Sequence, residues 1–330
     1  MPRWYGVGRG FFPEAMLYAA GRAYACGHVP KYPTEATDMK PPATAEQPAT
    51  IAAVPMTRTT YLKQTDPTME PMPDIQGSPD RRNVAIDRVG VKNVRYPISL
   101  YSPATGGSQP TVANIDMYVA LPHHQTGTHL SRFLVVITAH HDALLTDDMS
   151  SVCRAIKERL EADHAHLRLE FPYFIDKKAP VTGQLGKLDI EVVFECEAND
   201  ADDFVMTLRV PATSLCPCSK EISEYGAHNQ RCVMEASVRL GEGETMWIED
   251  LFAVVEQAAS TQVFSVLKRP DEKWVTERAY ENPKFVEDIV RDLAVALDAD
   301  ERIVWFRVNS ENFESIHSHN AYAEIIKDKR

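Results

Sequence analysis

The chain has 330 residues, of which 44% are hydrophobic and 25% charged, and 35 Lys and Arg against 47 Asp and Glu leave a formal net charge of −12. This length is enough for one large or two ordinary domains. An acidic chain without a basic stripe is a poor nucleic-acid binder, because phosphate neutralisation dominates that affinity. No apolar run is long enough to span a membrane, and no secretory signal is evident, so we expect a cytoplasmic globular protein.

The first part of the chain differs in composition from the rest. Twelve of the 22 prolines lie in residues 1–80, and the stretch 40–50 has the composition of a linker. We expect residues 1–69 to be a leader outside the fold. It is either a targeting segment or the result of a start codon upstream of the true one, which is then Met56 or Met69.

From residue 85 onward, alternation and helical periodicity predict the same order of elements twice. In the first half we expect strands at 95–102 and 111–121, helices at 128–140 and 147–164, and strands at 167–171 and 187–196. In the second half we expect strands at 203–211 and 232–240, helices at 247–267 and 282–297, and strands at 302–309 and 321–326.

The order ββααββ, repeated, predicts an α+β fold with two modules, at residues 70–200 and 201–330. Each module is an antiparallel sheet with helices on one face. Such sheets leave open edges, which pair with other chains or must be covered. We therefore expect a homo-oligomer that closes the sheets into a barrel; the alternative is a two-domain α+β monomer.

The segment 213–231 carries the most informative residues. Cys216 and Cys218 are separated by one proline, and His228 follows twelve and ten residues later. Thiolate and imidazole groups suit zinc and related metals. The segment is thus a candidate metal or nucleophile site, although the spacing is not that of a zinc finger, and ordinary buried cysteines in a loop are the alternative.

A second cluster, at 311–319, combines Glu311, Glu314, His317 and His319. Paired histidines can act as metal ligands or as a general acid and base, and a solvated polar loop is the alternative. Near 268–277, Lys268, Arg269 and Lys273 supply local positive charge suited to phosphates, and a solvated charged helix end is the alternative. The chain has no glycine-rich phosphate loop of either standard pattern.

Five stretches together resemble the type IB GTP cyclohydrolase I family of the tunnelling fold. They are residues 72–76, 127–133, 213–231, 268–287 and 311–319. The resemblance covers about residues 70–330. It implies two tunnelling modules per chain, homotetrameric barrels with active sites at subunit interfaces, and conversion of GTP and water to 7,8-dihydroneopterin triphosphate and formate.

The resemblance also implies roles for individual residues. Cys216, Cys218 and His228 are the expected metal or thiolate positions, with Glu272 a further carboxylate ligand, and His317 is the expected proton-transfer group. The metal is divalent, zinc or manganese, because a mixed Cys, His and Glu set is less specific for zinc than an all-cysteine set. The expected substrate-binding residues are Glu287, Glu314 and His319 for the base, and Lys268, Arg269 and Arg132 for the triphosphate.

The sequence leaves two alternative functions open. A nitrile reductase of the same fold uses one cysteine to attack a deazaguanine nitrile, and NADPH then reduces the thioimide. A non-catalytic module would use the Cys/His cluster to hold a structural metal, and would unfold when that metal is removed.

Overall fold

The computed structural model describes residues 73–140, 149–199 and 202–330. The expected leader at 1–69 lies outside these residues. Among the helices that the structure describes, none is long and apolar enough to cross a membrane.

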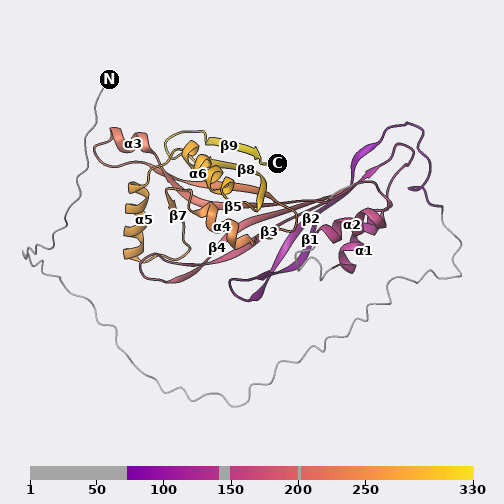
Figure 1. Cartoon of the computed structure of the whole chain (residues 1–330), viewed down its shortest axis with the longest axis horizontal. Helices are drawn as coiled ribbons and strands as arrows, with labels where there is room; N and C mark the ends of the chain where they lie inside the picture. Colours follow the sequence, from indigo (N-terminus) through magenta and orange to yellow (C-terminus); the bar gives the residue numbers. More distant parts are fainter. Residues whose placement is uncertain (1–72, 141–148, 200–201) are drawn as a thin grey trace, which may run out of the picture. The chain divides into compact units, whose positions relative to one another are not determined.

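The expected order of elements is confirmed in the first half, and in the second half α3, β7 and α5 are added to it (Figure 1). The first half comprises β1 (Ile86–Ser102), β2 (Gly107–Leu121), α1 (Leu130–Ala139), α2 (Met149–Arg159), β3 (Ala165–Lys178) and β4 (Leu185–Ala198). The second half comprises β5 (Asp202–Leu215), α3 (Pro217–Ile222), β6 (Asn229–Leu240), α4 (Ile248–Glu256), β7 (Thr261–Gln262), α5 (Arg269–Glu281), α6 (Val286–Asp298), β8 (Ile303–Asn312) and β9 (Ala321–Asp328). The fold is α+β, as predicted.

The strands form one antiparallel sheet in the order β1-β2-β3-β4-β5-β6-β8-β9, and the short β7 pairs with β5. The sheet runs through the predicted module boundary without a break, because β4 pairs directly with β5. Within the described residues, β1 and β9 each have a single strand neighbour, so both edges of this sheet are open.

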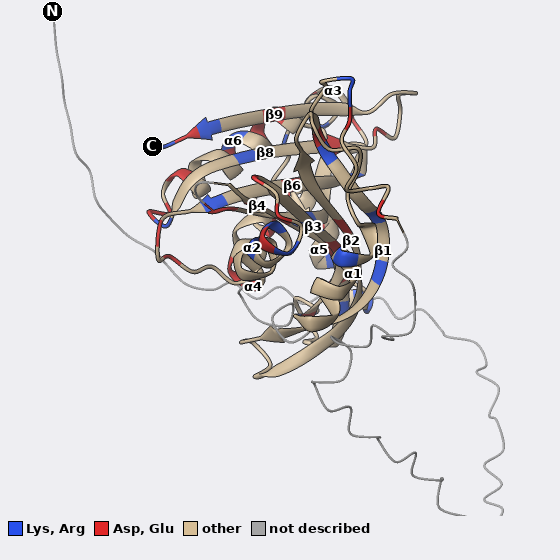
Figure 2. Cartoon of the chain, turned by 90° about the vertical axis from the view of Figure 1, so that its right-hand side faces the viewer, with Lys and Arg blue, Asp and Glu red and all other residues tan. Residues whose placement is uncertain are grey.

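One face of the sheet packs against the helices and the other is polar. In β3, Leu167, Leu169 and Phe171 are buried, while the alternating Arg168 and Glu170 belong to the opposite face. On that polar face Arg209 contacts three glutamates, Glu170, Glu191 and Glu235. Acidic and basic residues are interspersed along the chain (Figure 2).

The helices cover the apolar face through residues spaced at the helical period. In α6 the buried residues are Val286, Ile289, Val290, Leu293 and Leu297.

The prediction of a single helix over 247–267 is wrong. The helix α4 ends at Glu256, and Thr261 then pairs with Thr213 of β5, which ends helical structure before the loop that leads to α5. The sequence reading missed α5 because this helix buries only Asp271 and Ala279, so it has no apolar stripe. Pro270 in its first turn is compatible with a helix start.

The strands are longer than predicted, and β1 begins nine residues earlier than expected. Its first half is mostly exposed, contains a register shift between Val91 and Val94, and therefore lacks clean alternation. Gly90 is needed there because a Cβ at this position would lie 1.9 Å from the carbonyl oxygen of Met117.

Candidate functional site

Cys216 and His228 are neighbours at the base of the loop between β5 and β6. The amide of Cys216 donates a hydrogen bond to the carbonyl of His228 (3.1 Å), and the amide of His228 donates to Ser219 Oγ (3.2 Å). Cys216 is also the N-cap of α3, where its Sγ accepts from the amide of Ser219 (3.4 Å). The long loop predicted between these strands is therefore closed by hydrogen bonds that make Cys216 and His228 backbone neighbours.

The imidazole of His228 connects this loop to the second predicted cluster. Its Nδ1 lies 3.1 Å from Gln230 Oε1 and 3.3 Å from the hydroxyl of Ser315. Gln230 Nε2 donates to Ser214 Oγ (2.9 Å) and to Glu314 Oε1 (3.4 Å). The sequence analysis singled out Glu314 but missed Gln230, because the strand it expected begins at 232, whereas β6 begins at Asn229 and includes Gln230.

Of the cysteines that the structure describes, only Cys216 and Cys218 have accessible side chains. Cys218 is exposed and Cys216 is partly exposed, whereas Cys153, Cys196 and Cys232 are buried. Burial raises the pKa of Cys232 to about 12, so this thiol stays protonated at neutral pH. The reactive thiol chemistry of the described chain is thus confined to α3 and its N-cap.

The end of α5 and the start of α6 lie against the same loop. Lys220 Nζ donates to the carbonyl of Tyr280 (2.6 Å) and lies 4.4 Å from the centroid of its ring. The amide of Lys284 donates to the carbonyl of Leu215 (3.0 Å), the residue before Cys216. Glu287 follows in the first turn of α6 and is exposed.

Lys268, Arg269 and Glu272 lie at the opposite end of α5. That end is anchored by Asp271, which accepts hydrogen bonds from the amides of Val181 and Thr182 in the β3–β4 turn (2.9 Å each). From Glu272 to Tyr280 the helix rises about 12 Å. The structure therefore does not bring Glu272 into the Cys216–His228 pair within one chain.

The predicted metal ligands do not form a complete set in the described residues. No group of three or more His, Cys, Asp or Glu side chains there is arranged to hold a metal ion. Cys216 and His228, whose backbones are hydrogen-bonded, carry a thiol and an imidazole, which is donor chemistry suited to zinc. A third ligand has to come from outside this pair.

His317 and His319 lie in the exposed turn between β8 and β9 rather than in a strand. Their rings stack, with centroids 5.1 Å apart and planes inclined by 18°. Ser315, which contacts His228, is two residues away along the chain. Both imidazoles are accessible to solvent.

The two remaining motifs meet each other elsewhere in the fold. His129 Nε2 lies 3.2 Å from Asp74 Oδ2, and the amide of Gly127 donates to the carbonyl of Gln76 (3.0 Å). The amide of Gly77 is the main cause that lowers the pKa of Asp74, and His129 adds to it. Arg132, partly exposed on α1, belongs to this second cluster.

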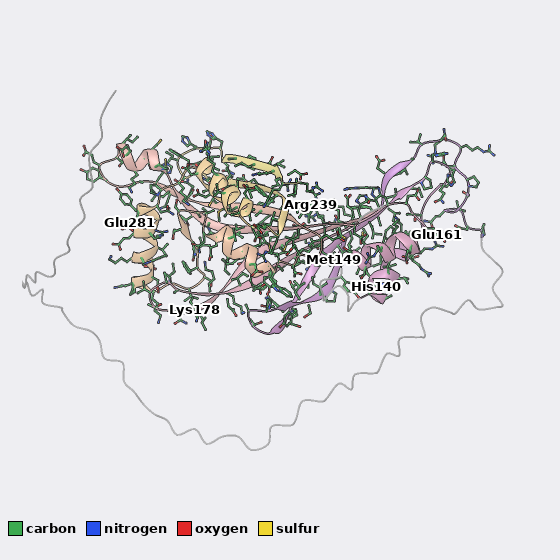
Figure 3. All side chains as sticks on the ribbon, viewed as in Figure 1. His140, Met149, Glu161, Lys178, Arg239 and Glu281 are labelled. Atoms are coloured by element: carbon green, nitrogen blue, oxygen red, sulfur yellow. The ribbon has the colours of Figure 1, made fainter. Side chains whose placement is uncertain are left out.

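The two clusters lie at opposite ends of the strands. The segment 127–133 follows the end of β2 at Leu121, and strand pairing places this end level with the start of β5 at Asp202. Cys216 follows Leu215, at the other end of β5. Along 14 residues of strand the separation is about 40 Å. In Figure 3, Glu281, at the end of α5, and His140, at the end of α1, lie toward opposite ends of the molecule's described part. Arg132 thus does not meet Lys268 and Arg269 within one chain.

Comparison with known proteins gives the family. The model for the family "type I GTP cyclohydrolase FolE2" matches residues 72–323. The protein named GTP cyclohydrolase FolE2 from Nitrosomonas eutropha is 51% identical over 270 residues, which covers 81% of this chain and 99% of the relative. Its namesake from Magnetococcus marinus is 52% identical over 261 residues, with coverage of 79% and 97%.

Solved structures give a much weaker likeness. The uricase from Arthrobacter globiformis matches with a TM-score of 0.43 and 10% identity, over 73% of this chain and 93% of that chain. A similarity this distant supports no argument on function.

The family match spans all five motif stretches that the sequence analysis selected. The match confirms the expectation of a type I GTP cyclohydrolase. The family description gives the name FolE2 and does not mention type IB, so the assignment to type IB stays a prediction. The chain belongs to the type I GTP cyclohydrolase FolE2 family.

Proposed function

We propose that this protein is a GTP cyclohydrolase I of type IB, which converts GTP and water to 7,8-dihydroneopterin triphosphate and formate. Relatives about half identical to the chain carry the name GTP cyclohydrolase. The observation that carries the proposal is the network from Cys216 through His228 and Gln230 to Glu314, because it joins two of the sequence motifs, residues 213–231 and 311–319, into one polar cluster. No comparable observation favours the nitrile reductase.

The reaction needs water to attack C8 of the purine, the imidazole ring to open, and formate to leave. Protons must pass to ring nitrogens and later to the ribose, and positioned acid–base groups typically contribute ~10²–10⁴-fold to such steps. His317 is the proposed proton-transfer group and His319 its neighbour, since imidazoles change charge near neutral pH.

Different residues are proposed to bind the guanine base and the triphosphate of GTP. A carboxylate can accept hydrogen bonds from both N–H groups on the guanine edge, and Glu314 and Glu287 are the proposed acceptors. Lys268 and Arg269 are proposed to bind the triphosphate. They are exposed at the start of α5, and no ion pair involving either is found within the described residues.

We further propose that the enzyme requires a divalent metal, zinc or manganese, held by Cys216 and His228. When bound, the metal would supply hydroxide near neutral pH by lowering the pKa of water. Glu272, the predicted third ligand, lies at the far end of α5, so the set is incomplete in a single chain.

A homotetramer with interfacial sites, and a cytoplasmic location, complete the proposal. The cluster of Asp74, His129 and Arg132 cannot reach Cys216 in its own chain, but can do so from a second copy that pairs along an open sheet edge. Arg132 would then join the triphosphate site from the neighbouring subunit.

The test is a GTP turnover assay on the purified full chain, following formate and the fluorescence of the oxidised neopterin. Chelation should abolish product, and added manganese or zinc should restore it, while circular dichroism stays unchanged. Cys216→Ala and His317→Ala should each lower kcat at least 10²-fold. Ser318→Ala, in the same turn as His317, is the matched control and should retain activity.

Absence of product with every metal, from a folded oligomer, would refute the hydrolase and lead to a nitrile reductase assay with NADPH. Unfolding on chelation would instead identify a structural metal.

A further inference from the structure

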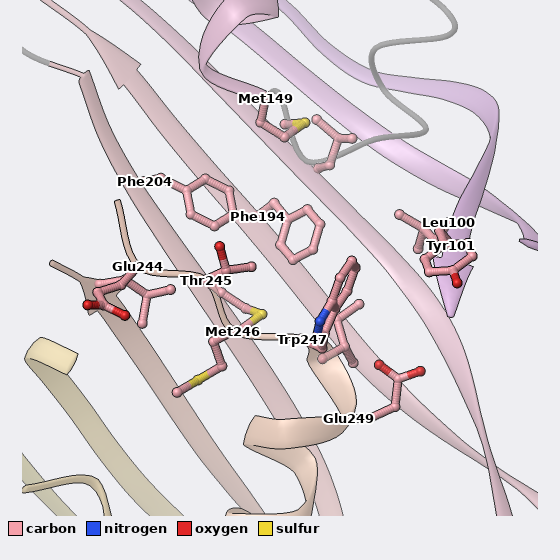
Figure 4. Close-up of a pocket in the computed structure, with 14 residues that line it drawn as sticks. Leu100, Tyr101, Met149, Phe194, Phe204, Glu244, Thr245, Met246, Trp247 and Glu249 are labelled. Atoms are coloured by element: carbon pink, nitrogen blue, oxygen red, sulfur yellow. The ribbon is translucent and has the colours of Figure 1, made fainter. Parts of the chain in front are cut away.

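A cavity on the helix-covered face of the sheet takes no part in the proposed chemistry. It has a volume of 190 Å³ and lies between the middle strands and the helices α2 and α4 (Figure 4). Phe204 and Met206, near the start of β5, form part of its wall. They are about ten residues, or about 30 Å, from Cys216 along the strand. The cavity is therefore separate from the Cys216–His228 cluster.

The inner wall is apolar and aromatic. Phe194 and Phe204 meet edge to face, with ring centroids 5.4 Å apart, and Met149, Met206 and Met246 complete this surface. An apolar cavity of about 150 Å³ accommodates benzene. The volume here is thus suited to one aromatic ring with a short substituent.

A fixed carboxylate stands at one side of the cavity. Glu249 Oε1 accepts hydrogen bonds from Ser102 Oγ (2.6 Å) and from the hydroxyl of Tyr173 (2.8 Å), both of which are buried. Burial raises the pKa of Tyr173 to about 12, so its hydroxyl remains a donor at neutral pH. Both donors use the same oxygen, and within the described residues no hydrogen bond to Oε2 is found.

The mouth of the cavity favours a cation. The rings of Tyr101 and Trp247 meet edge to face at 5.9 Å, beside Glu249. Aromatic faces attract an ammonium group, and more strongly when it is partly desolvated. Glu244 adds a second carboxylate at the rim, where Arg302 lies close enough to interact with it, whereas the described lining residues include no Lys or Arg beside Glu249.

We propose that this cavity binds a small aromatic amine, with its ring against Phe194 and Phe204 and its ammonium on Glu249 Oε2 beside Tyr101 and Trp247. The wall comes from both halves of the chain, since Tyr101 and Phe194 belong to the first and Phe204 and Trp247 to the second. An occupant therefore bridges the two halves and stabilises the native state by mass action.

The test measures binding of three probes to the full chain by isothermal titration calorimetry and thermal unfolding. The probes are phenethylammonium, the neutral 2-phenylethanol and the anionic phenylacetate. We expect phenethylammonium to bind at least ~10-fold more tightly than phenylethanol and to raise Tm, because only the cation pairs with Glu249. Phenylacetate should not bind.

Two variants locate the site. Glu249→Gln should remove the preference for phenethylammonium over phenylethanol and leave phenylethanol binding within about twofold. Glu242→Gln is the matched control, because Glu242 is exposed nearby but does not line the cavity, and it should change nothing. Cys216→Ala should retain phenethylammonium binding, which separates this cavity from the GTP site.

Equal affinity for the three probes, or a preference that survives Glu249→Gln, would overturn the proposal. Failure of all three probes to bind a folded protein would overturn it as well, and would mean that the cavity is already filled or closed. None of these results bears on GTP turnover, so the proposed function is tested independently.

Discussion

Cys216 and Cys218 have the same side chain as Cys232, but their surroundings give them different chemistry. Cys232 lies on β6 under the helices, where burial disfavours the thiolate. Cys216 and Cys218 lie at the start of a six-residue helix that buries none of its residues. Because solvent reaches both side chains, either thiol can ionise, and the thiolate is the form that acts as nucleophile or metal ligand.

We expect iodoacetamide to modify Cys216 and Cys218 in the chelated native protein, and to leave Cys153, Cys196 and Cys232 unmodified. With its pKa raised to about 12, Cys232 carries on the order of 10³-fold less thiolate at pH 8 than an ordinary thiol. Peptide mass spectrometry, with urea-unfolded protein as the control, measures the pattern. Native modification of Cys232 at the rate of Cys218 would contradict the described burial.

At the scale of elements, the position of α5 depends on one buried carboxylate. Asp271 is inaccessible to solvent and accepts hydrogen bonds from Val181, from the amide and hydroxyl of Thr182, and from the amide of Lys268. Burial acts to raise the pKa of Asp271, but these hydrogen bonds outweigh it and hold the pKa well below its usual range. The start of α5, with Lys268 and Arg269, is thereby attached to the β3–β4 turn.

Asp271→Asn should lower Tm by about 5 °C at pH 7, because the replaced carboxylate is the acceptor of charge-assisted hydrogen bonds. The folded pKa is depressed, so the stabilisation is complete above the unfolded value near 4 and declines as pH falls below it. The difference in Tm between the two proteins should therefore shrink between pH 5 and pH 3.

Glu277→Gln, at an exposed position on the same helix, removes only a surface ion pair with Lys273 and should show a much smaller difference. A Tm difference for Asp271→Asn that is independent of pH would mean that the charge of Asp271 does not stabilise this junction.

At the scale of the whole molecule, the five motifs form two clusters that one chain cannot bring together. Residues 213–231, the end of α5 and 311–319 meet at one end of the sheet, and 72–76 meets 127–133 at the other. The open edges of β1 and β9 allow pairing with further copies. The two clusters can then approach each other only across a subunit interface.

Mixing subunits tests this arrangement. Cys216→Ala and Arg132→Ala should each be nearly inactive alone. A one-to-one mixture of the two, unfolded and reassembled, should regain about a quarter of the wild-type activity. Random pairing in a symmetric oligomer places an intact Cys216 opposite an intact Arg132 in about a quarter of the sites. A mixture of Cys216→Ala with His317→Ala is the control and should stay inactive, since both residues belong to the same end of one chain. Equal recovery in both mixtures would argue against the interfacial site.

The sequence by itself determined the fold class and the order of the main strands and helices, while the site residues that it selected stay predictions. Alternation and helical periodicity record which face of each element is buried, and this suffices for β3 or α6. It fails for α5, whose exposed polar surface carries no apolar period, and for β7, which is only two residues long.

Only the tertiary structure decided which of those residues meet. Strand register places His228 beside Cys216 and Gln230 beside Glu314, and it separates Glu272 and Arg132 from them. The cavity beside Glu249 also depends on strands and helices from both halves. Local sequence patterns report the burial of each element, whereas proximity between elements depends on register, helix length and sheet order, to which residues distant in the sequence contribute together.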